Sequence, residues 1–128
     1  MTRTTLRAPD APEPVGPYSH AAAARGELVF LSGQTPIDPA TGQLVEGDVA
    51  AQVTRVLANL AQVLAAGGLS FDDVVKVNVF LVDMDDFAAM NAVYASVVDA
   101  PHPARTTVAV AGLPLGARVE IEMVAVRS

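Results

Sequence analysis

The chain contains no cysteine and no tryptophan among its 128 residues. The absence of cysteine excludes disulfide bonds, thiolate nucleophiles and cysteine metal sites. The two histidines, His20 and His102, are far apart in the sequence and follow no metal-ligand spacing. We therefore expect the protein to use neither a metal nor a cofactor.

Positive charge is also scarce, with 8 Lys and Arg against 14 Asp and Glu and a net charge of −6. The basic residues are scattered singly, and Lys76 is the one lysine. A nucleic-acid partner normally requires a basic patch or stripe, so we expect no nucleic acid to bind. The first residues lack the apolar core of a secretory signal, and no apolar run reaches the ~18 residues of a membrane span. We expect no membrane association and a cytoplasmic location.

Two segments have helical periodicity. From Val49 to Leu64 apolar residues recur at steps of three and four, which is the stripe of an amphipathic helix. Asp48 suits the N-cap of this helix, and Gly67-Gly68 ends it. A second helix is expected over 84–98, capped by Asp83 or Asp85. Its apolar stripe consists of Phe87, Met90, Tyr94 and Val97.

Strands are predicted where β-branched or alternating apolar residues lie between turn signals. The expected strands are 2–7, 19–25, 28–34, 73–83, 105–110 and 118–126. Segments 19–25 and 28–34 look like a hairpin that turns near Gly26. This order predicts a single α+β domain over 1–128, with one mixed sheet of about five or six strands and both helices packed on one face.

The second face of that sheet is rich in apolar side chains rather than charges. It is expected to carry Phe30, Val74, Phe80, Val82, Val124 and Val126. Hydrophobic residues make up 52% of the chain and charged residues only 17%, which is a low share of charge for a small domain. We therefore expect this face to contact other copies of the chain.

Strand parity places the polar side chains. In 118–126, Glu120 and Glu122 alternate with apolar residues and so lie on the face away from the helices. In 105–110, parity puts Arg105 and Thr107 on that same face. An arginine there can be a solvated charge, half of an ion pair, or a receptor whose planar fork binds a carboxylate. The residues assigned to the core face of this strand are Thr106, Val108 and Val110.

Three further features are ambiguous by themselves. Asn91 lies close to the apolar stripe of the second helix, where its amide needs a partner, and a neighbouring backbone group is the simplest one. Ser32-Gly33 lies at the end of a predicted strand before a loop, and this pair of residues is common at strand ends. Tyr18 follows Gly16-Pro17 and can simply anchor the N-terminal arm.

Several motifs together resemble the RidA/YjgF family of reactive intermediate deaminases, which are also described as L-PSP endoribonuclease-like. The motifs are GPYS at 16–19, LSGQTPIDPATG at 31–42, NVFLVDMDDFAAMNAVY at 78–94, PAR at 103–105 and RVEIEMVAV at 118–126. They follow the family order and cover nearly the whole chain. The resemblance implies a chorismate mutase-like fold and a homotrimer with sites between its subunits.

The resemblance also implies an activity, the hydrolysis of small 2-imino acids such as 2-iminobutanoate and 2-iminopropanoate to 2-keto acids and ammonia. In that reaction Arg105 would clamp the substrate carboxylate and Glu120 would orient the attacking water. The other site-lining positions that match are Tyr18, Ser32, Gly33, Asn91 and Thr107. Thr107 stands where many relatives have cysteine, and His20 where glutamine is frequent.

Two other functions stay open at this point. One is a trimeric module that binds small carboxylates without turnover, although such relatives lack the arginine or the glutamate that this chain has. The other is an endoribonuclease of the L-PSP type, which the negative net charge disfavours.

Overall fold

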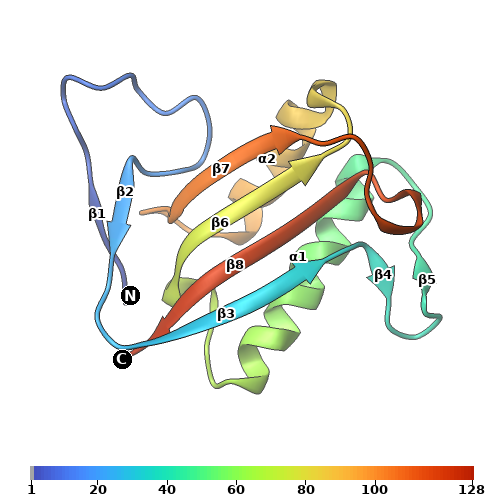
Figure 1. Ribbon diagram of the computed structural model, residues 1–128, viewed down its shortest axis with the longest axis horizontal. Helices are drawn as coiled ribbons and strands as arrows, with labels where there is room; N and C mark the ends of the chain where they lie inside the picture. The colour runs from blue at the N-terminus through green and yellow to red at the C-terminus, as the bar shows by residue number, and fades with distance from the viewer. Residues whose placement is uncertain (1) are drawn as a thin grey trace.

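A four-stranded mixed sheet forms the centre of the computed structural model, which describes residues 2–128, and both helices cover one face of that sheet (Figure 1). The strand order is β3-β8-β6-β7. The strands β6 and β7 are parallel, and the other neighbouring pairs are antiparallel. Their bounds are Glu27–Gln34 for β3, Val74–Leu81 for β6, Ala104–Ala109 for β7 and Val119–Arg127 for β8.

Four short strands form two separate ribbons beside the main sheet. In one, β1 (Thr4–Leu6) pairs with β2 (Ala21–Ala23), and in the other β4 (Ile37–Asp38) pairs with β5 (Gln43–Leu44). The α+β class and the placement of both helices on one face are as the sequence predicts. The central sheet has four strands rather than five or six, because the two N-terminal strands belong to their own ribbon.

The predicted hairpin between 19–25 and 28–34 is wrong, since β2 pairs with β1 and β3 pairs with β8. Gly26 lies between β2 and β3 with φ +138°, a backbone conformation that residues with a side chain rarely adopt. A Cβ at this position would lie 2.1 Å from the carbonyl oxygen of Arg127. Gly26 therefore carries the chain from the ribbon into the main sheet, close against the end of β8.

The helices begin and end largely where the sequence predicts. Helix α1 spans Val49–Ala66, and the Asp48 carboxylate caps it by accepting the N–H of Ala51 at 3.0 Å. Helix α2 spans Phe87–Val97, later than predicted, because a 3₁₀ turn over Met84–Asp86 precedes it. In that turn the Asp83 carboxylate accepts the N–H of Asp85 at 2.9 Å.

The hydrophobic core lies between α1, α2 and the helix-covered face of the sheet. Helix α1 is long and apolar enough to cross a membrane by composition, but its buried stripe packs against the sheet, which accounts for that composition. The fully buried residues of this stripe include Val53, Val56, Leu57 and Leu60.

The other face of the sheet is largely uncovered within residues 2–128 and is apolar at its β3 side, as predicted, although Val126 at the end of β8 is buried. Phe30 is 72% exposed and Leu28 is 58% exposed, although both are large hydrophobic residues in a regular strand. Val74 is an exception to the predicted set, because a bulge between Val74 and Lys76 reverses its parity and buries it in the core.

Candidate functional site

Arg105 lies on the helix-covered face of the sheet, so the prediction that placed it on the open face is wrong. In the register of β6 and β7, Arg105 is opposite Val77 and Thr107 is opposite Val79, and both valines are fully buried in the core. Opposite residues of neighbouring strands share a face. The residues of β7 that face away from the helices are Thr106 and Val108, which pair with Asn78 and Phe80.

The guanidinium of Arg105 is enclosed by three aromatic rings. Its central carbon lies 5.0 Å from the ring centre of Tyr94, 5.5 Å from Tyr18 and 5.8 Å from Phe87, distances at which a cation is attracted to the ring faces. Nη2 donates a hydrogen bond of 2.6 Å to the side-chain oxygen of Asn91. The partner of Asn91 is therefore Arg105 rather than the backbone group that the sequence favoured.

Helix α2 supplies one wall of this enclosure. Phe87, Asn91 and Tyr94 recur at steps of four and three, so they occupy one face of the helix and all reach the same guanidinium. The sequence assigned Phe87 and Tyr94 to the core alone. The signal that identifies them as site residues is the polar Asn91 between them on the apolar stripe.

Two nitrogens of the Arg105 guanidinium have no acceptor among the residues that the structure describes. Nε and Nη1 are buried and without a hydrogen-bond partner among residues 2–128, and the residue is only 8% exposed. The ion pairs within residues 2–128 instead involve Arg7, Arg118 and Arg127. Burial lowers the pKa of Arg105, with Tyr94 and Tyr18 opposing part of that shift. Arginine nevertheless stays protonated in proteins, so the site holds a buried cation that lacks an anion.

A pocket of about 260 Å³ opens beside this cation. It is lined by Val15, Tyr18, Phe87, Arg105, Thr106 and Thr107. The hydroxyl of Thr107 is also buried without a partner among the described residues. The backbone at Gly16 passes so close that a Cβ there would lie 3.1 Å from Nη2 of Arg105. The pocket therefore offers hydrogen-bonding groups to a ligand of a few atoms.

The GPYS and PAR motifs are far apart in the sequence but adjacent in the structure. The backbone N–H of Ser19 donates to the carbonyl of Pro103 at 3.3 Å, and its hydroxyl donates to the carbonyl of His102 at 2.5 Å. The hydroxyl of Tyr18 accepts the N–H of Val15 at 3.1 Å. These bonds hold the Tyr18 ring beside the start of β7, where Arg105 lies.

The remaining predicted site residues gather on the open face. Glu120 in β8 pairs with Phe80 in β6, and Gly33 at the end of β3 lies directly beside its carboxylate. A Cβ on Gly33 would be 2.2 Å from Oε2 of Glu120. Ser32 is the exposed neighbour of Gly33. Glu122, the second glutamate of this face, accepts a hydrogen bond of 3.1 Å from Asn78.

Arg105 and Glu120 therefore belong to two separate groups within one chain. They lie on opposite faces of the sheet, two strands apart and offset by three residues along the strands. With ~4.8 Å between strands and ~3.3 Å per residue, their Cα atoms are about 14 Å apart, with side chains directed to opposite sides. One small substrate cannot contact both groups of the same chain. The Arg105 group comprises Tyr18, Asn91, Arg105 and Thr107, and the Glu120 group comprises Ser32, Gly33 and Glu120.

Comparison with known proteins identifies this combination of motifs. A family model described as Endoribonuclease L-PSP matches residues 8–127. The chain belongs to the RidA/YjgF family. It is 42% identical over 127 residues to the 2-iminobutanoate/2-iminopropanoate deaminase of Mus musculus, a match that covers 99% of this chain and 93% of that protein.

Solved structures of RidA/YjgF proteins share the fold. RidA from an Antarctic Psychrobacter species superposes with a TM-score of 0.77 at 43% identity, covering 97% of this chain and 99% of that one. Escherichia coli TdcF, solved with bound serine, superposes with a TM-score of 0.76 at 39% identity, covering 98% and 99%. The chorismate mutase-like α+β arrangement that the sequence predicts is thus the arrangement of this family.

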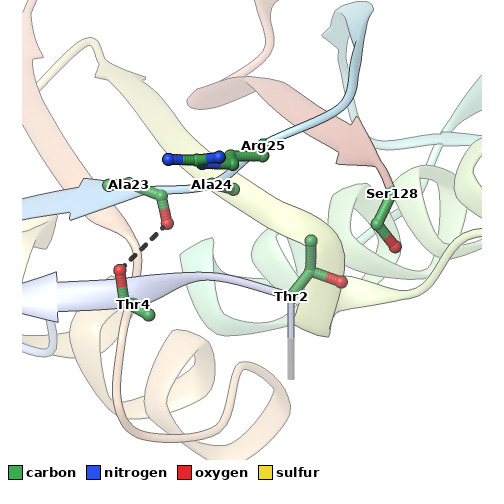
Figure 2. Close-up of a pocket in the computed structure, with 6 residues that line it drawn as sticks. All are labelled: Thr2, Thr4, Ala23, Ala24, Arg25 and Ser128. Atoms are coloured by element: carbon green, nitrogen blue, oxygen red, sulfur yellow. Dashed lines mark hydrogen bonds between the residues drawn. The ribbon is translucent and has the colours of Figure 1, made fainter.

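A larger cavity of this RidA/YjgF protein lies away from both groups. It has a volume of about 670 Å³ and lies between the β1-β2 ribbon and the C-terminus (Figure 2). Its lining residues are Thr2, Thr4, Ala23, Ala24, Arg25 and Ser128. None of the predicted site residues is among them. Within residues 2–128, no group of three or more His, Asp or Glu side chains is arranged to hold a metal ion.

Proposed function

We propose that the protein hydrolyses small 2-imino acids, such as 2-iminobutanoate and 2-iminopropanoate, to 2-keto acids and ammonia. The observation that carries the proposal is the buried guanidinium of Arg105, which lines a pocket of about 260 Å³ and has two nitrogens without an acceptor among residues 2–128. A carboxylate supplies two acceptor oxygens in the planar geometry that a guanidinium matches. The name of the mouse relative and the serine bound to Escherichia coli TdcF support a small carboxylate with nitrogen on its second carbon.

The same proposal includes a homotrimer with sites between subunits. The Arg105 group and the Glu120 group lie on opposite faces of one chain, so a complete site needs Glu120 from a second copy. The open face that carries Glu120 also exposes Phe30 and Leu28, which are apolar residues that a partner subunit would cover. The family resemblance favours three copies over two.

In this mechanism the substrate carboxylate accepts hydrogen bonds from the guanidinium of Arg105. The rings of Tyr18 and Phe87 exclude water from that contact, which strengthens it and fixes the position of the imine carbon. Glu120 of the partner subunit orients a water molecule and takes its proton as the water oxygen bonds to the imine carbon. That proton then passes to the imine nitrogen, which gives a carbinolamine. The hydroxyl proton of the carbinolamine next moves to the nitrogen as the carbon–nitrogen bond breaks and the C=O bond forms, so that ammonia leaves the 2-keto acid.

A coupled assay tests the proposal. A dehydratase converts serine to 2-aminoacrylate, whose imine tautomer is 2-iminopropanoate, and added protein is expected to accelerate the release of ammonia and pyruvate. Arg105→Ala is expected to abolish that acceleration while the protein stays folded. A wild-type protein that binds pyruvate without accelerating hydrolysis would instead be a carboxylate-binding module. RNA cleavage by the purified protein at physiological salt, unaffected by Arg105→Ala, would support an endoribonuclease.

A further inference from the structure

Arg3 is almost completely buried, with 3% of its surface exposed, although no carboxylate forms an ion pair with it among residues 2–128. It directly precedes β1, and its guanidinium donates four hydrogen bonds to backbone carbonyls. Nη1 donates to Phe71 at 2.8 Å and to Val74 at 3.1 Å, Nε donates to Pro101 at 2.9 Å, and Nη2 donates to Asp99 at 3.1 Å.

These four carbonyls belong to two segments that lead into the strands of the site. Phe71 and Val74 lie at the 3₁₀ turn that enters β6, whereas Asp99 and Pro101 lie in the loop that enters β7. The two strands are parallel neighbours, so their entry points lie side by side. Arg3 therefore joins the starts of both strands from one point.

The loop that enters β7 needs such support. Strand β7 is at the edge of the main sheet, where β6 is its neighbouring strand and Ser19 forms an isolated bridge with Ala104. Arg105 is the second residue of β7. On one side the loop is held by the two bonds of Ser19 to His102 and Pro103. On the other side it is held by the two bonds of Arg3 to Asp99 and Pro101. The loop is thereby fixed between the GPYS motif and Arg3.

Burial of a cation without an ion-pair partner is unfavourable, and it lowers the pKa of Arg3 despite the opposing charges of Asp72 and Asp73. An apolar side chain would avoid the burial of a charge but would leave the four carbonyl oxygens without these donors. The planar guanidinium of Arg3 instead holds several carbonyl oxygens at fixed positions at once, because its N–H groups point in fixed directions. A small displacement of those carbonyls would move Arg105 relative to its three rings and Asn91.

We propose that Arg3 is a positioning residue for Arg105, because it fixes the entry of β7 and thereby keeps Arg105 in the wall of the pocket. This inference rests on the proposed function, since it assumes that Arg105 binds the substrate carboxylate. Arg3 itself does not touch substrate. Because the carboxylate contact exists before and during the reaction, a displaced Arg105 weakens substrate binding more than it slows the chemical step.

The test compares Arg3→Met, which keeps most of the side-chain volume but has no donors, with Arg25→Ala, a matched loss of an exposed arginine near the same ribbon. KM and kcat are measured with 2-iminobutanoate, and the Kd of the product 2-oxobutanoate is measured by titration calorimetry at 25 °C. Arg3→Met is expected to raise KM and Kd about tenfold or more with kcat within about threefold, because displacements near 1 Å have effects of this order. Arg25→Ala is expected to match the wild type.

A purely structural role would give a different result. If Arg3→Met lowers the melting temperature but leaves KM and Kd at 25 °C unchanged, the positioning role is overturned. Arg3→Lys keeps the charge and three donors on one atom, so it is expected to bind 2-oxobutanoate more tightly than Arg3→Met does. If Arg3→Met does not fold, KM and Kd of Arg3→Lys are compared with those of the wild type instead. Arg105→Ala, titrated alongside, separates the two proposals. Unchanged 2-oxobutanoate binding by Arg105→Ala would refute the proposed function itself.

Discussion

The substitution Gly33→Ala separates turnover from carboxylate binding. A Cβ at this position would lie 2.2 Å from Oε2, 2.9 Å from Cδ and 3.1 Å from Cγ of Glu120, so the glutamate side chain has to move by about an ångström or more. The backbone of Gly33 does not require glycine, because its φ lies outside the left-handed region. The obstructing atoms belong to a flexible side chain, so the fold is expected to tolerate the change.

A displacement of this size in a group that positions the attacking water is expected to lower kcat about 100-fold. In the proposed site Arg105 holds the carboxylate and Glu120 contacts the attacking water, so the Kd of 2-oxobutanoate should change less than about threefold. Steady-state kinetics with 2-iminobutanoate and calorimetric titration with 2-oxobutanoate measure the two quantities. Gly112→Ala is the matched control, since nothing lies within 4 Å of a Cβ there. A Gly33→Ala protein with wild-type kcat would refute the role given to Glu120.

Three further outcomes follow from the same structure. Gly16→Ala places a Cβ 3.1 Å from Nη2 of Arg105, so it should raise the Kd of 2-oxobutanoate in calorimetry, whereas Gly33→Ala should leave that Kd nearly unchanged. An unchanged Kd for Gly16→Ala would contradict the pocket geometry. Burial, with the nearby charges of Arg3 and Arg105, lowers the pKa of His102 from 6.5, so the unfolded chain binds its proton first. The free energy of unfolding, measured with urea, should therefore decrease as pH falls below 6.5, and His102→Gln should reduce that decrease. Phe30→Asp puts a charge on the uncovered apolar face, so size-exclusion chromatography should show dissociated subunits, and an intact oligomer would argue against an interface there.

The local pattern of the sequence was sufficient for the helices and for the class of fold. Asp48 caps α1 through a side-chain bond that its type and position predict, and the stripe that follows is the one that is buried. The motifs also predicted that Asn91 and Arg105 belong to one site, and a hydrogen bond of 2.6 Å joins them.

The sequence pattern did not predict which residues of β7 face the helices. Alternation tells which side chains share a face, but not which layer covers that face. In β7 the apolar Val108 lies on the uncovered side, whereas the polar Arg105 lies under α2, where aromatic rings enclose it. An edge strand can thus have a polar residue on its helix-covered face and an apolar residue on its open face. The hairpin at Gly26 failed for a similar reason, because turn chemistry does not reveal which strand is the partner.

The proposed function gives the two groups different roles. The Arg105 group would bind the substrate carboxylate, whereas the Glu120 group would position the attacking water. Loss of either group has a distinct consequence, so variants of Arg105 and Glu120 should be inactive for different reasons.

Subunit mixing tests the central claim most directly. Arg105→Ala and Glu120→Ala proteins, each inactive alone, are unfolded together in equal amounts, refolded and assayed with 2-iminobutanoate. In a cyclic trimer with shared sites, every mixed trimer contains one site with both residues intact, so random assembly should give about one quarter of wild-type activity. Recovery near that level is the predicted result. No recovery, with mixed trimers demonstrated by mass spectrometry, would show that Arg105 and Glu120 do not act together across subunits.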